Sequence, residues 1–185
     1  MTKESRSKEI YFLLLALGLS VSVFLNTGLF LAGVTQHSTA FSKAQATLYS
    51  GSFASRLLYA GILVPWLEEL VFRGALYRIL ARFVRWEYAL ILSSLAFGIY
   101  HLNVPQGIYG FVLGCIFACC MKETGLLRLC GALHMAVNVL ALILTESGFY
   151  EYVFSSVMRS VVLLVFSGLF AGVVVLLGFR NKESN

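Results

Sequence analysis

Charge and proline are both scarce in this chain. Only 12% of its 185 residues are charged and two are proline, whereas 59% are hydrophobic. A soluble domain usually has about 25% charged and about 45–50% apolar residues. The composition therefore excludes an ordinary soluble domain. It favours one membrane domain over residues 1–185, with the lipid bilayer as its surroundings.

The chain also lacks a basic module and a metal-binding cysteine pattern. Its net charge is +5, but the basic residues lie between apolar segments, where the positive-inside rule accounts for them. We therefore expect no nucleic-acid partner. The four cysteines, Cys115, Cys119, Cys120 and Cys130, form no Cys-x-x-Cys pair. We expect them to be buried, reduced thiols rather than zinc ligands.

Six apolar segments predict the helices. The first is too long for the core of a signal peptide, about 7–15 residues, and long enough to span a membrane at about 20 residues. The segments are about 10–33, 56–77, 87–101, 107–121, 126–145 and 157–179. We expect 35–55 and 146–156 to be loops. The sequence thus predicts an all-α integral membrane protein, a bundle of about six transmembrane helices with a polar site inside. The third and fourth helices are short for a full span.

The basic residues are distributed unevenly across this topology. Ten of the lysines and arginines fall in the two tails and in the connectors 78–86 and 122–128, and three fall on the opposite side. Cytoplasmic segments of membrane proteins carry such an excess. We therefore expect both termini in the cytoplasm.

Ionisable residues inside the apolar segments are the main indication of function. They are Glu68, Glu69, Arg73, His101 and His134. An ionisable side chain costs about 2.5–3.5 kcal/mol at the centre of a membrane helix. We therefore expect these groups to face each other or water, within a core at 56–145.

Their spacing assigns roles. Glu69 and Arg73 lie four residues apart and can pair along one helix face. Glu68 points about 100° away, so it stays available as a general base, with His101 holding a water against it. His134 and Asn138 are also four apart and can stabilise an oxyanion. Such a set suits hydrolysis of an acyl bond without a covalent nucleophile, because the Gly-x-Ser-x-Gly pattern is absent.

Three ordered motifs carry a family resemblance. Glu68-Glu69-x-x-x-Arg73, Phe97-x-x-x-His101 and His134-x-x-x-Asn138 resemble the motifs of the CPBP family, which includes type II CAAX prenyl endopeptidases and bacterial Abi-type proteins. The resemblance implies an intramembrane glutamic endopeptidase acting on a peptide or membrane-protein substrate, which is prenylated in some relatives. Glu68, His101, His134 and Asn138 would be catalytic, and Glu69 and Arg73 would support them. It also implies a bacterial cell membrane.

The sequence is also compatible with other functions. The chain could be a membrane scaffold without proteolytic activity, or a regulatory or bacteriocin-immunity protein. A small transporter is a weaker alternative, because we see no inverted repeat. A zinc-dependent version of the protease is also conceivable, since two histidines and a glutamate can bind zinc. The sequence has no His-Glu-x-x-His pattern, and we expect no cofactor.

Overall fold

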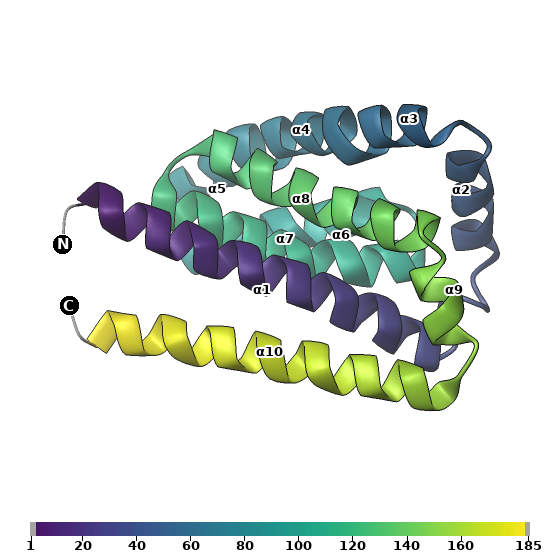
Figure 1. Cartoon of the computed structure of the whole chain (residues 1–185). Helices are drawn as coiled ribbons and strands as arrows, with labels where there is room; N and C mark the ends of the chain where they lie inside the picture. Colours follow the sequence, from purple (N-terminus) through teal and green to yellow (C-terminus); the bar gives the residue numbers. More distant parts are fainter. Residues whose placement is uncertain (1–2, 184–185) are drawn as a thin grey trace.

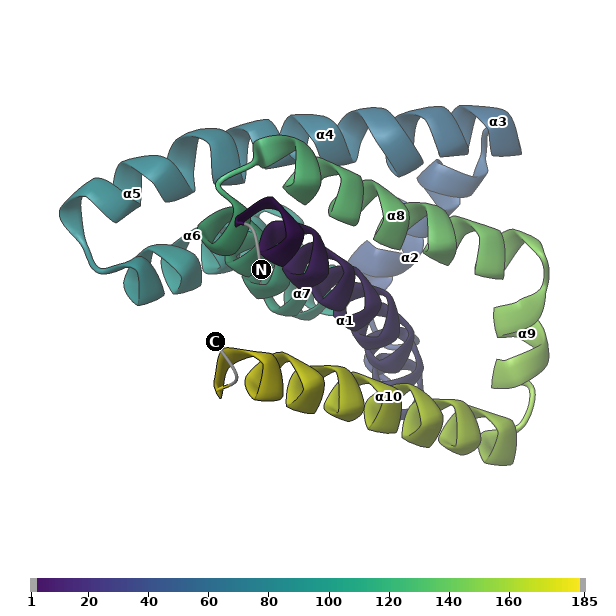
Figure 2. The same ribbon diagram turned by 60° about the vertical axis from the view of Figure 1, so that its left-hand side comes forward.

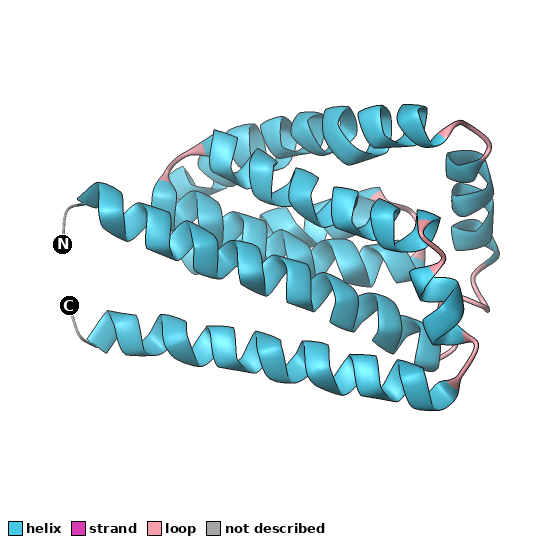
Figure 3. Cartoon of the chain, in the orientation of Figure 1, coloured by secondary structure: helices cyan, strands magenta, loops and turns pink. Residues whose placement is uncertain are grey.

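The computed structural model describes residues 3–183, and in that range it contains helices and connecting loops but no strand (Figure 3). The predicted domain, 1–185, extends beyond these residues at both ends. All six predicted helices are present, so the all-α membrane fold is confirmed. The uninterrupted ones are α1 (Lys3–Leu31), α6 (Trp86–Tyr100), α7 (Val104–Thr124), α8 (Leu127–Glu146) and α10 (Val157–Glu183). Within the described residues, four helices are long and apolar enough to cross a bilayer, at 8–31, 104–124, 127–146 and 157–178.

The second predicted helix is a segmented rod that spans 53–83. It consists of α3 (Phe53–Arg56), η1 (Leu57–Leu63), α4 (Val64–Glu69), η2 (Leu70–Tyr77) and α5 (Arg78–Phe83). The two η segments are π-helical: at the end of the first, the amide of Val64 donates to the carbonyl of Tyr59, five residues back. Such turns are rare and frequently mark functional sites. Glu68 and Glu69 end the short α-helical piece between them.

The two predicted loops each contain a helix. The segment 35–55 forms α2 (Thr39–Tyr49), capped by Ser38, whose hydroxyl accepts from the amide of Phe41 at 3.2 Å, and 146–156 forms α9 (Phe149–Phe154). No residue of α2 is buried. The sequence of α2 is polar, like that of a loop. It lacks the apolar pattern that predicts a transmembrane helix, so the helix was not predicted.

The fourth helix is longer than predicted. It begins at Val104 rather than 107, because Pro105 fits the first turn of a helix, where its missing N–H is not needed. Asn103 caps this turn by accepting a hydrogen bond from the amide of Gln106 at 3.0 Å. The helix therefore has 21 residues, enough to cross a bilayer at about 1.5 Å per residue. The third helix stays short, at 15 residues.

Both chain ends lie at the same end of the bundle, together with the α5–α6 and α7–α8 connections, while α2 and α9 lie at the other (Figure 1). We call these the terminal end and the α2 end. The predicted basic connectors are thus at the terminal end. Helix α10 packs along α1 at the outside of the bundle (Figure 2).

The core lies between α6, α7, α8 and the rod. It contains Phe97, Leu113, Phe117, Leu133 and Val137, which are almost completely buried. The outward faces are apolar too, with Phe166 and Leu169 of α10 more than half exposed. A helix that is hydrophobic all round and exposed on the outside is typical of a protein surrounded by lipid.

Candidate active site

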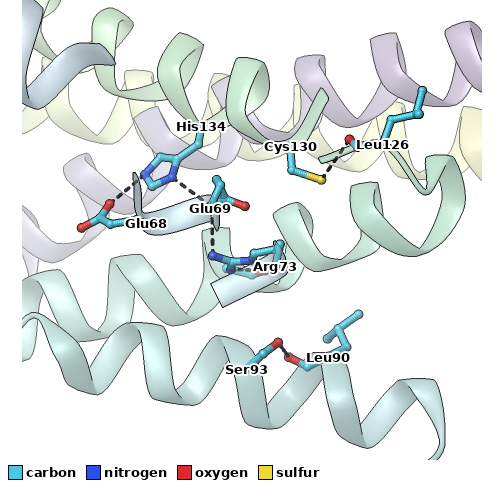
Figure 4. Close-up of polar contacts among 9 residues, drawn as sticks. Glu68, Glu69, Arg73, Leu90, Ser93, Leu126, Cys130 and His134 are labelled. Atoms are coloured by element: carbon cyan, nitrogen blue, oxygen red, sulfur yellow. Dashed lines mark hydrogen bonds and ion pairs between the residues drawn. The ribbon is translucent and has the colours of Figure 1, made fainter. Parts of the chain in front are cut away.

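A fully buried ion pair lies at the centre of the bundle. Arg73 Nη1 lies 2.9 Å from Glu69 Oε1, and both side chains are 0% exposed (Figure 4). The spacing of four residues predicts this pair. Arg73 Nη2 also donates to the carbonyl of Gly114 on α7 at 2.8 Å. The guanidinium group therefore links the rod to α7 and carries the charge that a buried carboxylate needs.

Two glycines make room for this arrangement. A Cβ atom on Gly114 would lie 2.9 Å from Arg73 Nη2, so a larger residue here would push the guanidinium group away from its position. On α8, a Cβ atom on Gly131 would overlap the indole ring of Trp66. Helix α8 can therefore approach α4 closely, and the next turn of α8 brings His134 to the glutamates.

His134 lies between the two glutamates. Its Nδ1 is 3.0 Å from Glu69 Oε1, and its Nε2 is 3.7 Å from Glu68 Oε2 (Figure 4). An ionised carboxylate can only accept hydrogen bonds, so Nδ1 carries a hydrogen and donates to Glu69. The other nitrogen, Nε2, then faces Glu68. Sequence spacing linked His134 to Asn138 and missed both glutamate contacts, because they join segments far apart in the chain, 65 residues in the case of Glu69.

Glu68 differs from Glu69 in its surroundings. Its side chain is 10% exposed, and its carboxylate reaches His134 at 3.7 Å, too far for a direct hydrogen bond. Arg73 binds Glu69 instead. The prediction that the two carboxylates are not equivalent is therefore confirmed, although both of them approach the same histidine.

The rings of His101 and His134 share one aromatic neighbour. The Phe97 ring centroid lies 5.0 Å from that of His101 and 5.6 Å from that of His134, in edge-on geometry. His101 follows the last residue of α6 and so approaches Phe97 from the α2 end. Its carbonyl accepts a hydrogen bond from the side chain of Asn103 at 2.9 Å. The structure thus gathers both histidines and both glutamates around the Phe97 region.

Asn138 contacts the rod rather than His134. Its Nδ2 donates to the carbonyl of Ala60 at 3.0 Å. In the π-helical register the amide of residue 65 would serve that carbonyl, but Pro65 has no N–H. Asn138 therefore supplies the missing donor. An amide nitrogen has two N–H groups, so one donor of Asn138 stays available for another acceptor.

We predict that Asn138→Ala lowers stability by about 1–3 kcal/mol, the usual cost of leaving a buried carbonyl unpaired. Pro65→Ala restores a backbone donor to this turn. The double variant should therefore recover most of the lost melting temperature, measured in detergent. Effects that simply add in the double variant would contradict the link between Pro65 and Asn138.

The cysteine, histidine and acidic side chains were the candidate metal ligands. Among residues 3–183 there is no group of three or more His, Cys, Asp or Glu side chains arranged to hold a metal ion. The side chain of Glu69, which lies nearest to His134, is also bound by Arg73. The four cysteines are free. The Cys130 thiol contacts the carbonyl of Leu126, the residue that precedes α8, and the Ser93 hydroxyl donates to the carbonyl of Leu90 within α6 (Figure 4).

Comparison with known proteins gives one match. Residues 50–140 match the model of a family described as type II CAAX prenyl endopeptidase Rce1-like. The matched range contains the whole rod, His101, His134 and Asn138, and it leaves out all of α1 and all of α10. Comparison with curated proteins and with solved structures finds no match.

Proposed function

Because the chain belongs to the Rce1-like family of type II CAAX prenyl endopeptidases, which is a protease family, we propose that it is an intramembrane glutamic endopeptidase. In this proposal Glu68 and His101 activate the water, His134 and Asn138 stabilise the oxyanion, and Glu69 and Arg73 support the site. The observation that carries it is the buried chain from Arg73 through Glu69 to His134, which ends opposite Glu68.

The contacts support a separate role for each of these residues. Arg73 binds Glu69, and Glu69 fixes the orientation and tautomer of the His134 ring. His134 Nε2 and Glu68 Oε2 then face each other at 3.7 Å. Both groups can accept or release a proton. Arg73 binds Glu69 rather than Glu68. The Glu68 carboxylate is therefore free to accept a proton from water.

The reaction follows from these positions. Glu68 takes one proton from a water molecule held beside His101, and the hydroxide oxygen bonds to the scissile carbonyl carbon. His134 and the second N–H of Asn138 stabilise the oxyanion as it forms. When the C–N bond breaks, the proton on Glu68 goes to the leaving amine. The products are a carboxylic acid and an amine, and no covalent intermediate is needed.

The substrate in this proposal is a peptide or a segment of a membrane protein. Prenylation is a property of substrates in some relatives, and we leave it as one form that the substrate can take. The excess of basic residues at the terminal end supports a topology with both termini in the cytoplasm. A bacterial cell membrane is the location that the family resemblance implies.

The proposal predicts that activity does not require a metal. Purified protein in liposomes should cleave a susceptible membrane peptide at an unchanged rate after treatment with a strong zinc chelator. Metal analysis of the same active preparation should find much less than one zinc per chain. The reason is ligand supply: a catalytic zinc needs three protein ligands and an open position, while Arg73 already binds Glu69.

The metal test has a clear opposite outcome. Inactivation by the chelator, reversal by added zinc and about one zinc per active chain would replace this mechanism by that of a metalloprotease. Absence of cleavage of any membrane peptide by well-folded protein would instead favour a scaffold that binds peptides without cutting them.

A further inference from the structure

Phe117 of α7 lies against the face of the His134 ring. The two ring centroids are 4.5 Å apart and the ring planes meet at 28°, which is a stacked arrangement. The side chain of Phe117 is 0% exposed. Phe117 belongs to none of the three motifs, and the steps proposed above give it no role. Because it lies on a different helix from His134, no spacing in the sequence relates the two residues.

The same side chain borders the arginine at the other end of the buried series of contacts. The guanidinium carbon of Arg73 lies 5.4 Å from the centre of the Phe117 ring, within the range of a cation–π contact, about 6 Å. One turn earlier on α7, the carbonyl of Gly114 accepts a hydrogen bond from the same guanidinium group. Helix α7 therefore contacts both ends of the series that runs from Arg73 through Glu69 to His134.

The hydrogen bond to Glu69 does not by itself fix the plane of the His134 ring. Nδ1 lies 3.0 Å from Glu69 Oε1, but a hydrogen bond holds well at any angle above about 150°. The ring can therefore rock about its bond to Cβ and keep this contact. Rocking turns Nε2 out of line with Glu68. Such changes matter for a reaction, because a misplacement of about 1 Å can cost about 10²-fold in rate.

Two buried aromatic rings restrict this rocking. Phe117 covers one face of the His134 ring, while Phe97 meets that ring edge-on, at an interplanar angle of 82°. Phe97 is 2% exposed and Phe117 is 0% exposed, so both rings lie in the densely packed core. A ring stacked on such a neighbour cannot rock without overlapping it or leaving a gap. The stacked face therefore keeps Nδ1 directed at Glu69 and Nε2 at Glu68.

We propose that Phe117 is a positioning residue: by stacking on His134 it holds the imidazole ring in the one plane that joins Glu69 to Glu68. The proposal rests on the protease function above and adds a residue to it. Phe117 acts through His134 and not on the reacting atoms, so its loss should slow the chemical step and leave substrate binding unchanged. Its flat face is the feature that matters, because an aliphatic side chain fills the space without fixing the plane of the ring.

The first test measures cleavage of a fluorogenic membrane peptide by Phe117→Leu in liposomes. We expect kcat to fall about 10–10²-fold while KM stays within about twofold of the wild type. Phe117→Tyr keeps the flat ring, and its kcat should stay close to that of the wild type. Phe154→Leu is the matched control. It removes a ring that stacks on Phe30 at 4.0 Å, at the α2 end, and it should leave kcat unchanged.

The second test observes the His134 ring directly and needs no substrate. The protein is prepared with 13C-labelled histidine, and NMR gives the order parameter of the ring Cδ2–H bond, which falls when the ring moves. The chain has three histidines, and the spectrum of His134→Gln identifies the signal of His134. We expect a rigid ring in the wild type and in Phe154→Leu, and a clearly lower order parameter in Phe117→Leu.

The outcomes separate this inference from the proposed function. An unchanged kcat, a higher KM at unchanged kcat, or a rigid His134 ring in folded Phe117→Leu would overturn the positioning role, and so would an equal loss of activity in Phe154→Leu. If Phe117→Leu does not fold, Phe117→Met replaces it, because methionine adapts to irregular gaps and also lacks a flat face. If the wild-type protein cleaves no peptide, the protease function fails, and the order parameter alone decides whether Phe117 holds the ring.

Discussion

Glu68→Gln is expected to abolish cleavage while the protein stays folded and inserted. Glutamine has nearly the same shape but cannot accept the proton of the attacking water. Loss of a general base alone costs about 10²–10⁴ in rate. Because Glu68 also delivers this proton to the leaving amine in our proposal, we expect activity to fall to the limit of detection. The rate should be measured on a fluorogenic membrane peptide in liposomes.

The stability of this variant should change little. Glu68 makes no ion pair with Arg73, and its contact with His134 is 3.7 Å long. Thermal melting in detergent should therefore stay within about 1 kcal/mol of the wild type. Normal turnover by folded Glu68→Gln protein would rule out the glutamate mechanism. Glu69→Gln is the matched control, and it should lower stability as well as rate, because Glu69 binds both Arg73 and His134.

Arg73→Met is expected to lower the free energy of unfolding by about 3–5 kcal/mol, the usual loss when one partner of a buried ion pair is removed. The change leaves the Glu69 carboxylate without its cation and the carbonyl of Gly114 without its donor. The measurement is the melting temperature or denaturant midpoint in a mild detergent. Arg73→Lys should recover only part of the loss, because a lysine cannot reproduce the two-pronged contact of the guanidinium group.

A double variant separates the contribution of the Glu69–Arg73 ion pair to stability from its contribution to activity. Glu69→Met combined with Arg73→Met removes both charges, and replacing a whole buried ion pair by apolar groups is often close to neutral. We therefore expect stability to return while activity stays low, because His134 has lost the acceptor that fixes its ring. An unchanged melting temperature of the single variant Arg73→Met would contradict the stabilising role of the pair.

The parts of this molecule that sequence predicts are those set by local spacing. The apolar segments predict six helices because length and hydropathy alone decide whether a helix can cross a bilayer. The contact between Glu69 and Arg73 follows from their separation by four residues. Helix α2 escapes this reasoning because it has no buried residue and no apolar run of the kind that predicts a transmembrane helix.

The parts of the site that sequence reasoning missed depend on contacts between distant segments. His134 lies between the two glutamates because Trp66 occupies the space above Gly131, and no spacing rule relates those two residues. The bond from Asn138 to Ala60 exists because Pro65 lacks an N–H. The proline itself was a visible signal: a carbonyl without a donor in a membrane helix needs a partner, and an asparagine on a neighbouring helix is a natural candidate.

The π-helical turns on both sides of α4 bear on how this protein can change length over evolution. A π-helical turn accommodates one residue more than an α-helical turn. Loss of a residue within Leu57–Leu63 or Leu70–Tyr77 can therefore be absorbed by converting that turn to an ordinary one. The same deletion inside Val64–Glu69 would rotate the glutamates by about 100° relative to His134. Relatives of different length should accordingly place their gaps in these flanking turns and never between Val64 and Glu69.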